Sequence, residues 1–153
     1  MNGEERYNSF IENIEGWIKS IGIIEVSPNE SVEKSLSLSF SDLKNLSYEE
    51  CQMLAYELYC YAEYVDSLLA KQKITHDWAE DAIWYIICDK INQYGDKYTK
   101  WQEKYFYSIK ENPLASQILK VKNTAHARME ILKNKSENIK KISETLNNLA
   151  KRR

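Results

Sequence analysis

Glycine and proline are scarce in this sequence, with four and two residues among 153. Because turn-rich β architectures need both residue types at their turns, this scarcity favours long, uninterrupted helices. No stretch approaches the roughly 18 consecutive apolar residues of a membrane-spanning helix. The first ten residues, MNGEERYNSF, lack the apolar run of a signal peptide. We therefore predict a cytoplasmic protein with no membrane association.

Motifs that carry catalysis are also missing. The three cysteines, Cys51, Cys60 and Cys88, form no CxxC pair, which favours free thiols in a reducing compartment. No glycine-rich phosphate-binding loop and no nucleophile motif occurs. His76 and Glu80 are spaced to share a metal ion on a helix, but two ligands do not make a site. The sequence therefore predicts no enzyme, no cofactor and no metal site.

Charge is distributed unevenly along the chain. Residues 1–90 contain 7 Lys/Arg and 17 Asp/Glu, a net charge of −10, whereas residues 91–153 contain 14 and 6, a net charge of +8. Two interpretations are open. Either the basic half faces a polyanion while the acidic half avoids it or meets a basic partner, or the two halves pack together and neutralise each other.

Residues 1–41 are predicted to form an N-terminal arm with two parts. Residues 4–21 have the period of an amphipathic helix, with apolar residues three or four apart: Phe10, Ile11, Ile14, Trp17, Ile18 and Ile21. Within residues 34–40, Leu36, Leu38 and Phe40 alternate strictly with Ser35, Ser37 and Ser39, which indicates a half-buried strand. Residues 23–26 are its predicted hairpin partner. The arm is thus a helix followed by a small extended or β segment.

Residues 42–153 are predicted to form a second, helical domain. Ser47 and Glu50 make a capping box that begins a helix spanning 47–94, either continuous or with a slight break near residue 76. A short helix at 96–111 bridges to a third, at 113–150, which Asn112 and Pro113 begin. The predicted fold is all-α, an antiparallel, coiled-coil-like hairpin of two long helices with a short bridging helix.

The last helix has a heptad of apolar residues in alternating steps of four and three. Arg128 and Lys135 interrupt it, as charges that fix register or oligomeric state often do. We predict that this seam mediates homo-oligomerisation through eight residues: Leu114, Ile118, Val121, Leu132, Ile139, Ile142, Leu146 and Leu149.

Aromatic and basic residues interleave in residues 94–110. Single-stranded nucleic acid is bound by this combination, because rings stack on bases and cations bind phosphates. We interpret Tyr98, Trp101 and Tyr105 as core, since they share one helix face. Basic residues of the last helix could form a solvated stripe, or at its end complement the helix dipole. The candidate nucleic-acid-binding residues are Lys97, Lys100, Lys104, Tyr107, Lys110, Lys133, Lys140, Lys151, Arg152 and Arg153.

Three segments resemble the helical hairpin of UvsY-type recombination mediators of tailed phages. These are LKNLSYEE at 43–50, the tyrosine-rich helix as far as Trp78-Ala-Glu80, and ARME at 127–130 through LAKRR at 149–153. The resemblance covers about residues 42–153. It implies an oligomeric, non-enzymatic protein that binds single-stranded DNA and helps load a recombinase onto strands coated by single-strand-binding protein. If a phage encodes it, the compartment is the host cytoplasm.

Two other functions stay open. The first is a coiled-coil protein-interaction adaptor, in which the acidic half and the heptad seam bind proteins and no nucleic acid is involved. The second is a phage or mobile-element inhibitor of a host nuclease, in which the acidic helix mimics DNA phosphates.

Overall fold

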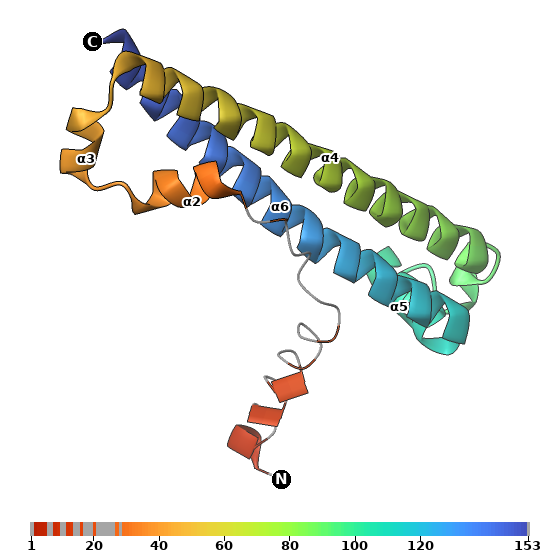
Figure 1. Cartoon of the computed structure of the whole chain (residues 1–153). Helices are drawn as coiled ribbons and strands as arrows, with labels where there is room; N and C mark the ends of the chain where they lie inside the picture. Colours follow the sequence, from red (N-terminus) through yellow and green to blue (C-terminus); the bar gives the residue numbers. More distant parts are fainter. Residues whose placement is uncertain are drawn as a thin grey trace.

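A computed structural model (Figure 1) describes residues 2–5, 8–9, 12–13, 16, 20, 27 and 29–152. Of these residues, 86% are helical and none lies in a strand, so the predicted all-α fold is confirmed. None of the helices in this part of the chain is long and apolar enough to cross a membrane. The elements are α2 (Glu30–Ser37), α3 (Phe40–Asn45), α4 (Tyr48–Ile87), a short 3₁₀ helix η1 (Ile91–Gln93), α5 (Trp101–Glu111) and α6 (Pro113–Lys151).

Helices α4 and α6 lie side by side in opposite directions, so the chain end lies beside the start of α4 (Figure 1). Local signals begin both helices. The hydroxyl of Ser47 accepts from the amide of Glu50, and the Asn112 side chain accepts from the amide of Ala115. Helix α4 is continuous and ends at Ile87, seven residues before the predicted end.

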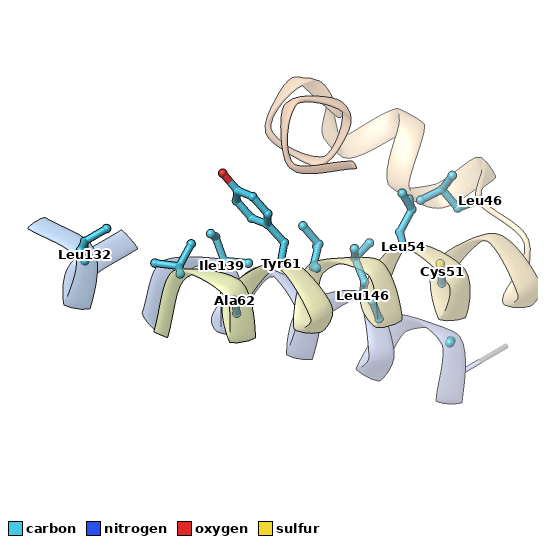
Figure 2. Packing of buried hydrophobic residues seen from close by; sticks show 12 residues of the cluster. Leu46, Cys51, Leu54, Tyr61, Ala62, Leu132, Ile139 and Leu146 are labelled. Atoms are coloured by element: carbon cyan, nitrogen blue, oxygen red, sulfur yellow. The ribbon is translucent and has the colours of Figure 1, made fainter. Parts of the chain in front are cut away.

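Two hydrophobic clusters hold the hairpin together. The first joins the N-terminal half of α4 to the C-terminal half of α6 and is seen from close by in Figure 2. The second lies at the other end, where α5 packs against both long helices. Between them, residues 66–78 of α4 contain no buried side chain. The buried residues of the first cluster include Leu46, Leu54, Leu58, Val65, Leu132, Ile139 and Leu146, and those of the second are Ile83, Ile87, Tyr105, Ile109 and Ala115.

The strand predicted at residues 34–40 is wrong. Residues 34–37 belong to α2, and Phe40 begins α3. Side-chain caps decide this, because Asn29 accepts from the amide of Val32 and Ser39 forms a capping box with Asp42. Helix α2 contacts α4, and Val32, Leu38 and Leu43 pack against the first cluster. Figure 1 shows α2 and α3 on the side of the hairpin where α4 begins.

The other predictions for the N-terminal arm fall mostly outside the described residues. The apolar residues of the helix predicted at 4–21, and the strand partner predicted at 23–26, are all among those not described. The described residues within 4–21 are helical.

Candidate nucleic-acid interface

The turn before α5 presents Lys97 and Tyr98 to solvent. The Asp96 carboxylate accepts from the amides of Tyr98 and Thr99, at 2.8 and 3.1 Å. Residues 97–99 form this turn instead of a helix, so α5 begins at Trp101 rather than at residue 96 as predicted. The Lys97 ammonium lies 5.0 Å from the centroid of the Tyr98 ring, so a cation and an aromatic face are paired at the surface.

Trp84 of α4 anchors the aromatic residues of α5. Its ring centroid lies 5.1 Å from that of Tyr105 and 6.2 Å from that of Trp101. Tyr105 is 7% exposed and belongs to the core, as predicted, but Trp101 is 59% exposed and Tyr98 is 82% exposed. Their assignment to the core is wrong, because Tyr98 precedes the helix and Trp101 occupies its first turn.

The outer face of α5 has a shallow recess between aromatic and basic side chains. Its volume is about 320 Å³, at the small end of ligand-binding pockets. Phe106 and Tyr107 are both more than half exposed and line it together with Lys110. Gln102 and Glu103 complete the lining. An accessible aromatic pair beside a cation is suited to holding a base and its phosphate.

The four predicted lysines of this segment are not equivalent. Lys97, Lys100 and Lys110 are exposed, whereas Lys104 is partly buried. Lys104 lies near the inner face, where its backbone carbonyl accepts from the buried Ser108 hydroxyl at 2.7 Å. Three of the four cations are therefore freely accessible to a ligand.

Lys140 does not belong to a solvated basic stripe, contrary to prediction. Its ammonium lies 2.7 Å from the Asp66 carboxylate of α4, and the hydrogen bond to Asp66 raises the pKa of Lys140. Burial alone would raise the pKa of Asp66, but the hydrogen bonds from Lys140 and Ser136 outweigh it and lower that pKa. Lys140 therefore joins the two long helices, and its charge is neutralised within the chain.

The remaining predicted cations lie away from α5. Lys133 is exposed midway along α6, and Lys151 and Arg152 are exposed at its end. Arg153 lies outside the described residues. At 1.5 Å per helical residue, the end of α6 is about 60 Å from α5. The structure therefore does not bring the predicted basic residues together into one surface.

The predicted oligomer seam is largely used within the chain. Leu132, Ile139, Ile142, Leu146 and Leu149 belong to the first core cluster, and Ile118 packs against the second. Leu132, Ile139 and Leu146 are buried within the molecule and are not available to another copy, whereas Ile118, Ile142 and Leu149 are only partly buried. Leu114 and Val121 are about half exposed.

Of the two interpretations of the charge asymmetry, mutual neutralisation is confirmed at two ion pairs, and the interpretation of a polyanion-facing half stays a prediction. Within the described residues, Asp66–Lys140 and Glu80–Lys122 join acidic α4 to basic α6. The exposed lysines around α5 lie outside these two pairs. The α5 end thus carries exposed aromatic side chains and lysines, together with the exposed Asp96, Glu103 and Glu111.

Phe106, Trp101 and Tyr98 were not among the predicted binding residues. Asp96 followed by Thr99 is a pattern typical of a side-chain-capped turn, and it could have indicated that Tyr98 and Trp101 lie outside the core. In comparisons with protein-family models, with curated proteins and with solved structures, no match to this chain was found.

Proposed function

We propose that the chain binds single-stranded DNA on the surface of α5 and the preceding turn. This α5 surface comprises Lys97, Tyr98, Lys100, Trp101, Phe106, Tyr107 and Lys110. One observation supports the proposal above the others: four aromatic side chains here are each more than half exposed, and three exposed lysines interleave with them. Stacking contributes on the order of 1–3 kcal/mol per base.

The chemistry of the α5 surface favours single strands over duplexes. Rings bind the π-faces of bases, which are already stacked inside a duplex. Lysines bind phosphates and carry no sequence information. Binding is therefore expected to be strongly dependent on salt and nearly independent of sequence.

We further propose a non-catalytic role as a recombination mediator in the cytoplasm, which the resemblance to UvsY-type proteins supports. In this role the protein helps load a recombinase onto DNA coated by single-strand-binding protein. The acidic first half of α4 suits a protein partner rather than DNA, because its exposed Glu57 and Glu63 repel phosphates.

Self-association is proposed to use an apolar face at the second half of α4. Trp78 and Tyr85, 76% and 86% exposed, lie seven residues apart on it, with Ile74 one turn before. A recess of about 630 Å³ opens between these two aromatic residues and Leu114 of α6. The aromatic rings of one copy can therefore fill the recess of the other copy, and the reverse. Such a self-complementary surface is what a two-fold interface requires. We therefore assign this α4 face to a second copy.

The same face gives the adaptor hypothesis its best support. An exposed apolar patch with two large aromatic residues is typical of protein-binding surfaces. Salt separates the two functions, since phosphate binding weakens steeply as salt rises and apolar contacts do not.

Fluorescence anisotropy with a labelled oligothymidine tests the DNA-binding proposal. Trp101→Ala with Phe106→Ala should weaken binding at least about tenfold, because two rings that stack on bases are removed. Tyr56→Ala is the matched control, because Tyr56 is also exposed but lies on acidic α4. The aromatic variants should leave the salt dependence of binding almost unchanged.

The lysines are tested in the same assay. Replacing Lys97, Lys100 and Lys110 by glutamine removes their charges. The slope of log K for DNA binding against log salt concentration should become shallower by about 0.7 for each phosphate that is no longer bound. Lys71→Gln with Lys73→Gln, on α4, should change neither affinity nor slope. If the wild-type protein shows no binding at tens of micromolar in low salt, the DNA-binding proposal is wrong and the adaptor function replaces it.

A further inference from the structure

Two histidines face each other in the part of the hairpin where the hydrophobic core is interrupted. His76 of α4 and His126 of α6 have ring centroids 5.9 Å apart, although 50 residues separate them in sequence. One helical turn from each stands a charged residue, Glu80 on α4 and Lys122 on α6. The Lys122 ammonium and the Glu80 carboxylate are 3.4 Å apart, a long distance for an ion pair. Both helices therefore place polar side chains at this level, next to the buried Ala79 and Ala125.

A hydrogen bond to Asp77 fixes the tautomer of the His76 imidazole. The His76 Nδ1 atom lies 3.1 Å from the Asp77 carboxylate. Because an ionised carboxylate can only accept, this hydrogen bond requires the proton to be on Nδ1, which leaves the Nε2 lone pair available. A carboxylate behind an imidazole is the common support of metal-binding histidines, since it fixes the ring and raises its basicity.

Ligand atoms of His76, Asp77 and Glu80 of α4 all lie within 4.8 Å of one another. His126 is not part of that group, and its relation to the site is given by the distance between the two imidazole rings. With zinc–nitrogen bonds of about 2.1 Å in tetrahedral geometry, two bound imidazoles have ring centroids about 5.2 Å apart. The observed 5.9 Å is slightly wider. His126 is exposed, so a small rotation of its side chain can close the difference.

We propose that His76, Glu80 and His126 bind a divalent transition-metal ion, with Zn²⁺ the best match, and that Asp77 supports His76 from behind. Two imidazoles and one carboxylate form a donor set of open zinc sites, in which water takes the fourth position. Mg²⁺ and Ca²⁺ prefer oxygen ligands throughout and do not suit it. The ion joins α4 to α6 between the two hydrophobic clusters.

Lys122 competes with the metal ion for the Glu80 carboxylate. It occupies the neighbourhood of Glu80, and its positive charge opposes a cation there. Its ammonium also lies 5.9 Å from the centroid of the Tyr105 ring. When the ion binds Glu80, Lys122 has this aromatic face as an alternative partner. Removing the Lys122 charge should therefore tighten metal binding.

The test uses the full chain without a histidine tag and with Cys60→Ser and Cys88→Ser, because both thiols are exposed and bind zinc themselves. Zn²⁺ and Mg²⁺ are titrated separately by calorimetry, and thermal unfolding is followed with each. At a zinc concentration near 100 times Kd, the melting temperature should rise by about 5–10 °C. Mg²⁺ should leave it unchanged.

Four variants locate the site. His126→Ala and Glu80→Gln should each weaken zinc binding at least about tenfold, and Asp77→Asn should weaken it by about 10–100-fold. Lys122→Met should strengthen it several-fold. Glu130→Gln, an exposed carboxylate one turn beyond His126 on α6, is the matched control and should bind zinc like the parent protein.

Melting curves without metal show that each variant is folded before zinc is added. The proposal is overturned if the parent protein shows no zinc-dependent rise in melting temperature. It is also overturned if His126→Ala, folded without metal, keeps the full rise and affinity, because zinc would then be bound elsewhere.

Discussion

The Ser143 hydroxyl of α6 donates a hydrogen bond to the backbone carbonyl of Ala55 on α4, at 2.7 Å. Both residues are buried, and Ser143 is completely inaccessible to solvent. The hydrogen bond requires the two helix backbones to approach closely, which small side chains on both helices permit.

Both removal of the Ser143 hydroxyl and replacement of Ser143 by a larger side chain are therefore expected to lower the free energy of unfolding. Ser143→Ala should cost about 1 kcal/mol of unfolding free energy, because the hydrogen bond is removed. Ser143→Leu should cost about 1–3 kcal/mol or more, because the buried position has no room for the larger side chain. Urea unfolding measures both. Thr145→Ala, on the exposed side of α6, should cause no loss, and a destabilisation equal to that of Ser143→Ala would contradict the explanation.

The Asp66–Lys140 pair should make stability depend on pH. The folded-state pKa of Asp66 lies below its ordinary value of 3.8, so its stabilisation is present above about that pH and is lost as pH falls through the lowered pKa. The pKa of Lys140 is raised above 10.5, so its stabilisation is present below that pH and is lost as pH rises through the raised pKa. Both side chains are about one-third exposed or more, so the coupling should not exceed about 1 kcal/mol.

Melting temperatures measured between pH 2.5 and 7 check the acidic limb. Asp66→Asn should flatten the loss of stability at low pH, whereas Glu144→Gln, on the exposed face of α6, should leave it as in the wild type. If Asp66→Asn loses as much stability at low pH as the wild-type protein does, the Asp66–Lys140 pair does not contribute to the pH dependence of stability.

Gly95 is required by the turn that positions Tyr98. Its φ is +92°, and an added Cβ would lie 2.3 Å from the Thr99 hydroxyl oxygen. Gly95→Ala should therefore destabilise the protein by about 1–3 kcal/mol and weaken oligothymidine binding, because the turn must rearrange. Gly3→Ala is the control, since an added Cβ there meets nothing within 4 Å. If Gly95→Ala is as stable as the wild-type protein, the turn does not require glycine at this position.

Folding and assembly should respond to different residues. Leu132 is 1% exposed in the first core cluster, so Leu132→Asp should unfold the monomer by burying a charge. Trp78→Ala with Tyr85→Ala should leave the melting temperature nearly unchanged but shift sedimentation toward the monomer. If the wild-type protein is monomeric across the micromolar range, the proposed self-association is wrong.

Local signals made much of the fold predictable. Ser47 and Asn112 accept from amides three residues further on, and Pro113 fixes its own φ at a helical value, so the starts of both long helices could be identified from neighbours in sequence. Local chemistry also explains the incorrect strand. The alternation in residues 34–40 matches a strand, but the caps at Asn29 and Ser39 favour short helices that this pattern does not reveal.

The candidate sites were less predictable because their partners are distant in sequence. Lys140 meets Asp66 across 74 residues, so nothing near it indicates that its charge is neutralised. His76 meets the His126 ring of α6 across 50 residues, so nothing near His76 in the sequence indicates this neighbour. Both relationships depend on the register of the hairpin, which sequence periodicity leaves free.

We expect the interruption between the two hydrophobic clusters to divide the hairpin into two cooperative units. Each cluster lies at its own end of the hairpin, and residues 66–78 of α4 between them contain no buried side chain. The α5 end should therefore open while the other end stays closed, at a free-energy cost below that of global unfolding. Hydrogen exchange should then show lower protection for amides around Ile83 and Ile109 than for those around Leu58 and Leu146. The end proposed to bind DNA is thus free to adapt its shape without loss of the fold.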